Sequence, residues 1–456
     1  MSQSGLAQAA QAARAVVPGP RGLPVVGVVN QFLGDPTNYL LQVSQRYGDL
    51  VRIKLGPRDL LLATHPDMVR RVVLDNARNY VKRYGQIGDL LGEGLVTSNG
   101  SSWLRQRRLM QPAFHHQRIA SFAEPIVDET NKLMERWAQA ARTRQPLNIA
   151  AEMMELAQSI IVRTMFSTEV REESQRIGQA FTYVLSHIVG RSFSMLKPPQ
   201  SWPTPANQRY REALAYLERT VAEMIAGRRR SGERPNDLLS MLIEAQDSET
   251  GEHMDDQQIR DEVMTVFFAG HETTASVLGW TLHLLAQHPM VERQVRAEQA
   301  AVLSGRVPTM ADLPQLSYGR MVFDEVLRLY PPGWFLSRFV KQDDQLGSYT
   351  IPAGSIVSLS PFVTHRLAAF WENPEGFDPE RFSPERSAGQ HKFAYLPFLS
   401  GPRKCIGDTF ALTEMQLALP VIFQHFRLSS IPGYPVGPKA RGTLRPSAVW
   451  MQIERV

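Results

Sequence analysis

The amino-acid sequence predicts a mainly α-helical α+β fold with a small β portion. Apolar residues recur at helical spacing over most of residues 66–329. Short runs of strand-forming residues, bounded by Gly, Pro and Asp, occur near residues 50–65, near 349–361 and in the C-terminal tail. No repeat and no low-complexity linker divides the chain. We therefore expect a flexible leader over residues 1–17 and one large domain over residues 18–456.

The N-terminal half begins with strands and continues with helices. The segments 50-LVRIKL-55 and 60-LLLATH-65 flank the turn residues 56-GPRD-59, and this pattern predicts a β-hairpin. Helical segments follow. Two runs rich in Gly, Ser and Pro interrupt them, at 99-NGSS-102 and at 197-KPPQSWPTP-205.

The C-terminal half combines helices with irregular segments. A helix ends at 331-PPG-333, because Pro disfavours the helical conformation in the residue before it. The other expected elements are a polar loop (247–256), a long helix (263–286), a strand-rich segment (349–361), an ordered loop (371–389), a helix (406–425) and a tail of turns and short strands (431–456).

Composition and charge exclude several classes of protein. The chain is 43% hydrophobic and 21% charged, as globular proteins are, and its net charge of +5 does not indicate a nucleic-acid partner. The most apolar run, 263–286, carries His, Glu and two Thr in its middle, which are costly to bury in lipid. We expect no integral membrane anchor. A single cysteine excludes an internal disulfide and favours a reducing compartment, so we expect a cytoplasmic protein, and a monomer.

The only cysteine, Cys405, lies in 397-PFLSGPRKCIGDTFALTEMQ-416, at the start of the predicted helix 406–425. Aligned amides and the helix dipole favour an anion at a helix N-terminus. A thiolate is the ligand that a soft or borderline metal needs. The alternative is a buried structural cysteine, a common role for a single Cys.

Four neighbours of the cysteine suit a flat, acidic cofactor. Gly401 and Gly407 place no side chain near the sulfur and let a flat group approach the backbone. Arg403 can reach an acidic group of the cofactor, and Phe398 can shield the sulfur from water. From Phe398 to Gly407, the segment resembles the haem-binding signature of the cytochrome P450 family.

This resemblance covers nearly the whole chain and implies the cytochrome P450 fold. It implies haem b (iron protoporphyrin IX) between the Thr273 helix and the Cys405 helix, with the Cys405 thiolate as the axial ligand of the haem iron. It also implies a soluble bacterial-type enzyme that inserts one oxygen atom from O2 into an organic substrate.

A second motif, 269-AGHETT-274, lies in the predicted central helix. The small residues Ala269 and Gly270 are expected to open a gap in the helix wall, where they would border the cofactor. Thr273 can donate a hydrogen bond to a carbonyl one turn earlier and loosen the helix. The resemblance implies that Glu272 and Thr273 deliver protons beside bound dioxygen.

A third motif is the pair Glu325 and Arg328, which share a helix face at i, i+3 spacing. Such a pair is common and means little alone. The family joins it to an arginine in a later loop, and 379-PERF-382 supplies Arg381. The resemblance implies a buried structural triad that serves folding and haem retention.

Several arginines are candidates for holding the haem propionates. Trp103 and Arg107 share a helix face at i, i+4 spacing, and the family uses this pair on a propionate. Arg338 and Arg403 resemble the other propionate partners. The alternative for each arginine is a surface salt bridge.

Electrons are expected to come from another protein, because no flavin or ferredoxin module is visible in the sequence. A ferredoxin or flavodoxin, with a reductase that uses NAD(P)H, would suit a basic docking face. The candidate residues of this face are Arg105, Arg108, Lys392 and Lys404. The run 228-RRR-230 is interpreted instead as a solvated helix face.

The substrate is expected to be lipophilic. By resemblance, the pocket is lined by stretches that are largely aliphatic and aromatic: 84–95, 181–193, 263–270, 333–337 and 442–444. They suit a fatty acid, terpenoid, steroid or polyketide. Two alternatives remain open, a peroxide-driven haem hydroxylase and a non-catalytic haem-thiolate binding or sensor protein.

Overall fold

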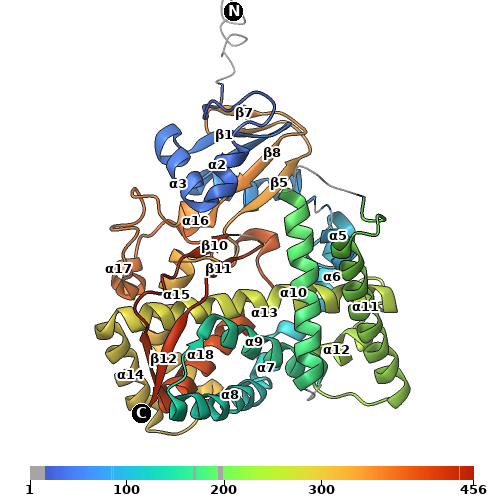
Figure 1. Cartoon of the computed structure of the whole chain (residues 1–456). Coiled ribbons are helices and arrows are strands. Elements are labelled where there is room, and N and C mark those ends of the chain that lie inside the picture. The colour runs from blue at the N-terminus through green and yellow to red at the C-terminus, as the bar shows by residue number, and fades with distance from the viewer. Residues whose placement is uncertain (1–15, 84, 86, 168–170, 194–198, 441) are drawn as a thin grey trace, which may run out of the picture. The chain divides into compact units, whose positions relative to one another are not determined.

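The computed structural model describes residues 16–83, 85, 87–167, 171–193, 199–440 and 442–456 (Figure 1). The structure is mainly helical with a smaller share of strands, which confirms the predicted fold class. Two compact units are each built from three stretches of chain: a β unit (residues 1–83, 333–376 and 389–404) and a helical unit (residues 84–332, 377–388 and 405–456). The single domain over 18–456 stays a prediction, and most of the leader lies outside the described residues.

The β unit is organised around a five-stranded sheet with the order β1-β2-β8-β5-β3. Its first two strands form the predicted hairpin, and β2 pairs with β8 in parallel while the other neighbours are antiparallel. The strands of this unit are β1 (Leu50–Leu55), β2 (Arg58–Ala63), β3 (Tyr80–Val81), β5 (Leu336–Val340), β6 (Asp344–Leu346), β7 (Tyr349–Ile351) and β8 (Ile356–Leu359).

Short helices complete the β unit. In α3, Asp35 caps the N-terminus by accepting a hydrogen bond from the Asn38 backbone (3.1 Å), and Gly48, at φ 94°, ends the helix. The helical elements are α2 (Val29–Gly34), α3 (Pro36–Tyr47), α4 (Pro66–Arg70), η1 (Arg71–Asp75), η2 (Ala77–Asn79), α16 (Pro361–Thr364), η6 (Lys392–Ala394) and η7 (Gly401–Arg403).

The helical unit contains the long helices of the protein and two small sheets, one of order β4-β12-β9 and one hairpin, β10-β11. Its helices are α5 (Ile87–Leu91), α6 (Gly100–Met110), η3 (Gln111–Phe114), α7 (His116–Ala120), α8 (Ala123–Thr143), α9 (Ile149–Phe166), α10 (Arg171–Phe193), α11 (Pro205–Ser231), α12 (Leu238–Glu244), α13 (Asp256–Gln287), α14 (Pro289–Leu303), η4 (Met310–Gln315), α15 (Ser317–Leu329), η5 (Pro379–Phe382), α17 (Pro384–Ser387) and α18 (Asp408–His425). Its strands are β4 (Leu147–Asn148), β9 (Phe426–Ser430), β10 (Pro438–Ala440), β11 (Leu444–Pro446) and β12 (Trp450–Arg455).

The helix α13 is the centre of the helical unit, as predicted for the run 263–286. It is 32 residues long, and Asp255 caps it by accepting a hydrogen bond from the Gln258 backbone (2.7 Å). In Figure 1 it runs across the whole unit, and it packs against α9, α11, α15 and α18. Most of its residues from Ile259 to Leu285 are buried, which explains the apolar character of the run 263–286. Within the described residues, no helix is both long and apolar enough to cross a bilayer.

Three expectations need correction. The helix after the cysteine begins at Asp408, so Cys405 lies ahead of its first turn. The segment 371–389 is not wholly irregular, because it contains η5 and α17. Arg228 is not part of a solvated face: its guanidinium donates to Asp237 (2.8 Å) and to the Phe166 carbonyl (3.1 Å), and only 11% of its side chain is exposed.

The loop before α6 is fastened to α13 by two carboxylates. Asp261 accepts a hydrogen bond from the Glu93 backbone and Glu262 one from the Leu95 backbone, each at 2.9 Å. A Cβ on Gly94 would lie 2.1 Å from Thr265 Oγ1, so glycine is needed for this close approach. Burial raises the pKa of Glu262 to about 8, although the Leu95 amide opposes this shift. Glu262 is therefore protonated at neutral pH.

We expect Glu262 to make the protein less stable as pH rises. An unfolded glutamate releases its proton near pH 4.5, whereas folded Glu262 keeps it until about pH 8. Between these values the folded state binds more protons, so the free energy of unfolding falls with rising pH. Denaturant unfolding from pH 5 to 8 should show a shallower fall for Glu262→Gln than for wild type, while Glu223→Gln, at an exposed position on α11, should match wild type. Equal slopes for Glu262→Gln and wild type would contradict this account.

Candidate functional site

Cys405, the single cysteine of the sequence, is exposed and lies just ahead of α18. Arg107, on α6, is half-buried near it. Burial lowers the pKa of Arg107, and the negative charges of Cys405 and Asp408 oppose that shift. A cation close to the sulfur stabilises its thiolate form. The structure thus brings together two residues that the sequence assigned to one cofactor, Cys405 as ligand and Arg107 as anion holder.

The donor chemistry fits a haem iron held by one protein ligand. In the described part of the chain, no group of three or more His, Cys, Asp and Glu side chains is placed to hold a metal ion. An exposed thiolate ahead of a helix offers a single soft ligand and leaves the remaining coordination to a cofactor. Gly407 caps α18 with its Cβ position 3.9 Å from the Phe114 ring, so no close contact crowds the backbone there.

The middle of α13 has one open face. Ala269 is exposed, and Glu272 and Thr273 are half-buried, in a helix whose neighbouring residues are mostly buried. Thr273 Oγ1 donates a hydrogen bond to the Ala269 carbonyl (2.7 Å), which confirms the predicted bond one turn back. Because the Thr273 hydroxyl already donates its hydrogen to this carbonyl, its oxygen can only accept a hydrogen bond from another donor.

Gly270 and His271 belong to the opposite, packed face of α13. A Cβ on Gly270 would lie 2.6 Å from Ile161 Cδ1 on α9, so this glycine permits helix packing. Of the two small residues, only Ala269 lies on the exposed face. His271 is buried between Phe181 and Phe267, and burial lowers its pKa. His271 is therefore neutral and part of the core.

The carboxylate of Glu272 is held by the C-terminal hairpin. Thr443 Oγ1 donates to Glu272 Oε1 (2.8 Å), and Arg445 Nη1 lies 3.6 Å from the same oxygen. The sequence analysis placed 442–444 beside the substrate but missed both contacts. No local signal reveals them, because the partners are more than 170 residues apart in the chain.

The predicted triad is present within the helical unit. Arg328 donates to both oxygens of Glu325 (2.7 and 2.8 Å), and Arg381 Nε donates to Glu325 Oε1 (3.1 Å). All three side chains are buried. The sequence analysis missed a fourth member, the Asp378 backbone, which also donates to Glu325 (2.9 Å). These bonds attach η5 to α15 around one buried carboxylate.

Comparison with known proteins identifies the family. A family model described as Cytochrome P450 matches residues 17–451. The chain belongs to the cytochrome P450 family. The crystal structure of the cytochrome P450DA heme domain has a TM-score of 0.90 to this structure, with 31% identity over 97% of this chain and 98% of that one.

Three curated relatives come from Streptomyces. Cyclooctatin synthase of Streptomyces melanosporofaciens is 39% identical over 93% of this chain and 92% of its own length. Cyclooctat-9-en-7-ol 5-monooxygenase of the same species is 39% identical over 91% and 90%. Pentalenene oxygenase of Streptomyces avermitilis is 36% identical over 93% and 94%. This cytochrome P450 is accordingly a haem-dependent monooxygenase that uses O2 and acts on a lipophilic substrate.

The other residues that the sequence predicts for the cofactor are found partly in the helical unit and partly in the β unit. Trp103, half-buried, is on α6 with Arg107 in the helical unit. Arg338, on β5, is buried, and its Nη1 donates to the Ser337 carbonyl (2.9 Å) in the β unit.

The β unit also holds Phe398, Gly401 and Arg403. Gly401 has φ 71°, and a Cβ there would lie 2.0 Å from the Val73 carbonyl, so only glycine fits its turn against η1. The assignment of Trp103 and of these β-unit residues to the haem stays a prediction.

Two of the four basic residues predicted for partner docking, Arg105 and Arg108, form ion pairs within the protein, whereas Lys392 and Lys404 are exposed. Arg105 pairs with Glu252 (3.4 Å), and Arg108 pairs with Asp247 (2.9 Å) and Glu249 (3.0 Å). The Asp247 carboxylate is fully buried, so Arg108 fastens the loop 247–255 to α6. An open cleft of about 550 Å³ adjoins it, lined by Arg108, Gln111, Pro112, His115, Gln117, Arg118 and Ser248.

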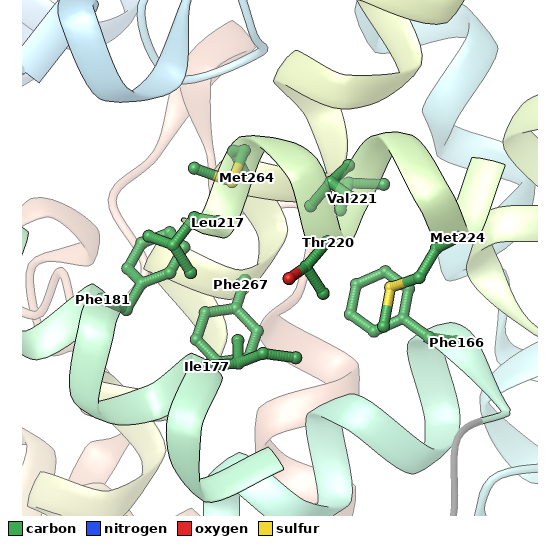
Figure 2. Close-up of a pocket in the computed structure, with 10 residues that line it drawn as sticks. Phe166, Ile177, Phe181, Leu217, Thr220, Val221, Met224, Met264 and Phe267 are labelled. Atoms are coloured by element: carbon green, nitrogen blue, oxygen red, sulfur yellow. The ribbon is translucent and has the colours of Figure 1, made fainter. Parts of the chain in front are cut away.

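Part of the predicted pocket lining surrounds a small apolar cavity of about 20 Å³ between α9, α10, α11 and α13. Figure 2 shows Phe181, Phe267 and Met264 among the lining side chains, and the hydroxyl of Thr220 carries the only oxygen among the side chains drawn. This volume holds about one water molecule, so the cavity is a packing gap and is too small for a substrate.

We expect the triad to contribute strongly to stability. In Arg381→Ala, the buried Glu325 carboxylate loses one of its two cationic partners, which costs about 3–5 kcal/mol in comparable buried pairs. Arg386→Ala, which removes a half-exposed ion pair with Asp378 in the same segment, should cost about 1 kcal/mol or less. Denaturant unfolding measures both. Equal losses for the two variants would contradict a buried structural triad.

Proposed function

We propose that this cytochrome P450 oxygenates a terpenoid, by inserting one oxygen atom of O2 into a C–H or C=C bond. The observation that carries the reaction class is the exposed thiol of Cys405, combined with the open acid–alcohol face of α13. The substrate class rests on the relatives, whose names state that one acts on cyclooctat-9-en-7-ol and another on pentalenene. The apolar character of the predicted lining stretches supports a hydrocarbon-rich substrate.

Different residues are proposed to bind the cofactor and to leave space beside it. Cys405 would hold haem b through its iron, and Trp103, Arg107, Arg338 and Arg403 would hold the propionates. The bound haem supplies the oxidising chemistry, which no side chain can supply. Ala269 leaves room on the open face of α13, because its side chain is a single methyl group. The rest of that helix is packed against neighbours, so bulk water is excluded from its other faces.

Thr273 and Glu272 are proposed to move the protons that the reaction consumes. The Thr273 hydroxyl donates to Ala269, so it can accept a hydrogen bond from an acid or a water molecule. Glu272 is the acid next to it in the chain, and its carboxylate is partly exposed, which allows it to exchange protons with water. This acid–alcohol pair favours an O2-dependent monooxygenase over a peroxide-driven hydroxylase, which needs no delivered protons.

Electrons are proposed to come from NAD(P)H through a reductase and a ferredoxin or flavodoxin. The open cleft lined by Arg108, His115 and Arg118 is the site that we propose for docking an acidic carrier, with Arg118 as its main cation because Arg108 is paired with Asp247 and Glu249. We propose that the enzyme works in the cytoplasm as a monomer, in keeping with the single cysteine and with the lack of a bilayer-spanning helix among the described residues.

The substrate proposal is tested by titrating the purified ferric protein with lipophilic compounds. We expect polycyclic sesquiterpenes and diterpenes to shift the Soret band to shorter wavelength, because they displace water from the iron. Their products, formed with a ferredoxin, a reductase and 18O2, should gain one labelled oxygen atom. Shifts and products from fatty acids or steroids alone, with none from terpenoids, would overturn the terpenoid assignment and leave the monooxygenase class intact.

We expect Thr273→Ala to uncouple NAD(P)H oxidation from product formation. Loss of the hydroxyl interrupts proton delivery, so product per NAD(P)H should fall by about tenfold or more while H2O2 release rises. Thr274→Ala is the matched control, because Thr274 makes the same bond one turn back, to Gly270 (3.1 Å), but lies on the buried face. Unchanged coupling in Thr273→Ala, or an equal loss in Thr274→Ala, would contradict the relay.

A further inference from the structure

We propose that Thr443 and Arg445 are positioning residues that fix the Glu272 carboxylate at the inner end of a proton-uptake route, with Arg445 at its solvent side. This inference rests on the proposed role of Glu272 as proton donor. It adds the C-terminal hairpin, which is remote in the chain, to the machinery of oxygen activation.

The hairpin is fixed firmly to the helical unit. Its strands β10 and β11 are antiparallel, and Leu444 is fully buried, with its backbone N–H donating to the Pro332 carbonyl (3.1 Å). Pro446 packs on α13 at Gly279, where a Cβ would lie 3.3 Å from Pro446 Cγ. Arg445 lies on β11 between these two anchors, and Thr443 directly precedes the strand, so both side chains are held close to α13.

Both contacts fall on one oxygen of the carboxylate. Thr443 Oγ1 and Arg445 Nη1 approach Glu272 Oε1 at 2.8 and 3.6 Å. A carboxylate restrained through one oxygen has a defined orientation and keeps its second oxygen for taking and giving a proton. The hairpin thus limits the rotamers of a side chain that would otherwise move freely on an open helix face.

The exposed fractions of Glu272 and Arg445 indicate which end of the proposed proton route faces bulk water. The Glu272 side chain is 15% exposed and the Arg445 side chain 33% exposed, so Arg445 lies nearer to bulk water. A half-buried carboxylate loses part of its hydration, and the nearby guanidinium offsets this cost. Water that hydrates Arg445 is within reach of Glu272, and we place the entry of protons there.

The proton balance is simple. Glu272 takes a proton from water at the Arg445 side and becomes a carboxylic acid. It then donates that proton to the Thr273 oxygen, and Thr273 releases its own hydroxyl proton, which turns away from the Ala269 carbonyl, to the dioxygen that is being reduced, so that the alcohol is regenerated. Glu272 returns to the carboxylate, and no electron moves in these steps. One proton passes per cycle of Glu272.

The competing interpretation is that Thr443 and Arg445 only anchor the hairpin. If the two residues position Glu272, variants that lose the charge or the hydroxyl should lose coupling, and variants that keep it should regain coupling. If they only anchor the hairpin, proton transfer should be unaffected in all variants. Arg445→Lys keeps the charge and Thr443→Ser keeps the hydroxyl, whereas Arg445→Met and Thr443→Val remove them. Lys439→Met is the control, because Lys439 is the exposed cross-strand neighbour of Arg445 in the same hairpin.

The first measurement needs no turnover. In the ferric holoenzyme, thermal unfolding of Glu272→Gln, Arg445→Met and the double variant reports whether the two side chains interact. We expect the midpoint shift of the double variant to be smaller than the sum of the single shifts. Additive shifts would mean that the ion pair is not formed, and would overturn the proposal.

The second measurement follows turnover with O2, a ferredoxin and a reductase. We expect Arg445→Met and Thr443→Val to lower product per NAD(P)H by two- to tenfold and to raise the solvent deuterium isotope effect. Arg445→Lys and Thr443→Ser should recover most of the coupling, and Lys439→Met should match wild type. Turnover driven by iodosylbenzene, which delivers an oxygen atom without protons, should stay within about twofold in all variants.

The outcomes separate this inference from the function on which it rests. Loss of coupling in Glu272→Gln, with wild-type coupling and isotope effect in both hairpin variants, would overturn the positioning role and leave the proton role of Glu272 intact. Wild-type coupling in Glu272→Gln itself would overturn both. If Arg445→Met does not fold, Thr443→Val still decides, because it removes a single contact on Glu272 and leaves Arg445 in place.

Discussion

We propose that a bond between the Cys405 sulfur and a haem iron is the interaction on which the function of this protein depends. A thiolate ligand must be open to a flat cofactor and yet be fixed in place. The chain meets the first demand by leaving Cys405 exposed ahead of α18, with Arg107 nearby to stabilise the negative charge. It meets the second with α18 itself, which is buried over most of its length, and with α15, which packs on α18 and is fastened to η5 by the Glu325 carboxylate.

The central helix shows how one element serves both packing and chemistry. Adjacent residues in a helix point in different directions, so Gly270 and His271 pack against the core while Ala269 and Thr273 stay on the open face. The acid on the open face, Glu272, is hydrogen-bonded to Thr443 beside the hairpin strand β11. This contact is the basis of our proposal that α13 and the hairpin act together in proton delivery.

What the sequence predicts well is local. The segment Phe398–Gly407, the run 269–274 and the Glu325–Arg328 pair are short patterns, and the Thr273 bond and the triad geometry are present as expected. The features that the sequence does not predict are tertiary contacts. Burial of Arg228 against Asp237, the ion pairs of Arg108, and the hold of Thr443 on Glu272 join segments whose proximity only the fold creates. The exact start of α18 was also missed, because helix ends depend on capping contacts that a periodic pattern does not encode.

The account is tested most directly by the absorption spectrum of the reduced, CO-bound protein, recorded for wild type and for Cys405→His. Wild type should show the long-wavelength Soret band that thiolate ligation produces. The histidine variant, if it retains haem, should show a band at the shorter wavelength of imidazole ligation. A wild-type protein without the long-wavelength band, or a variant that keeps it, would contradict the central claim that Cys405 ligates the iron.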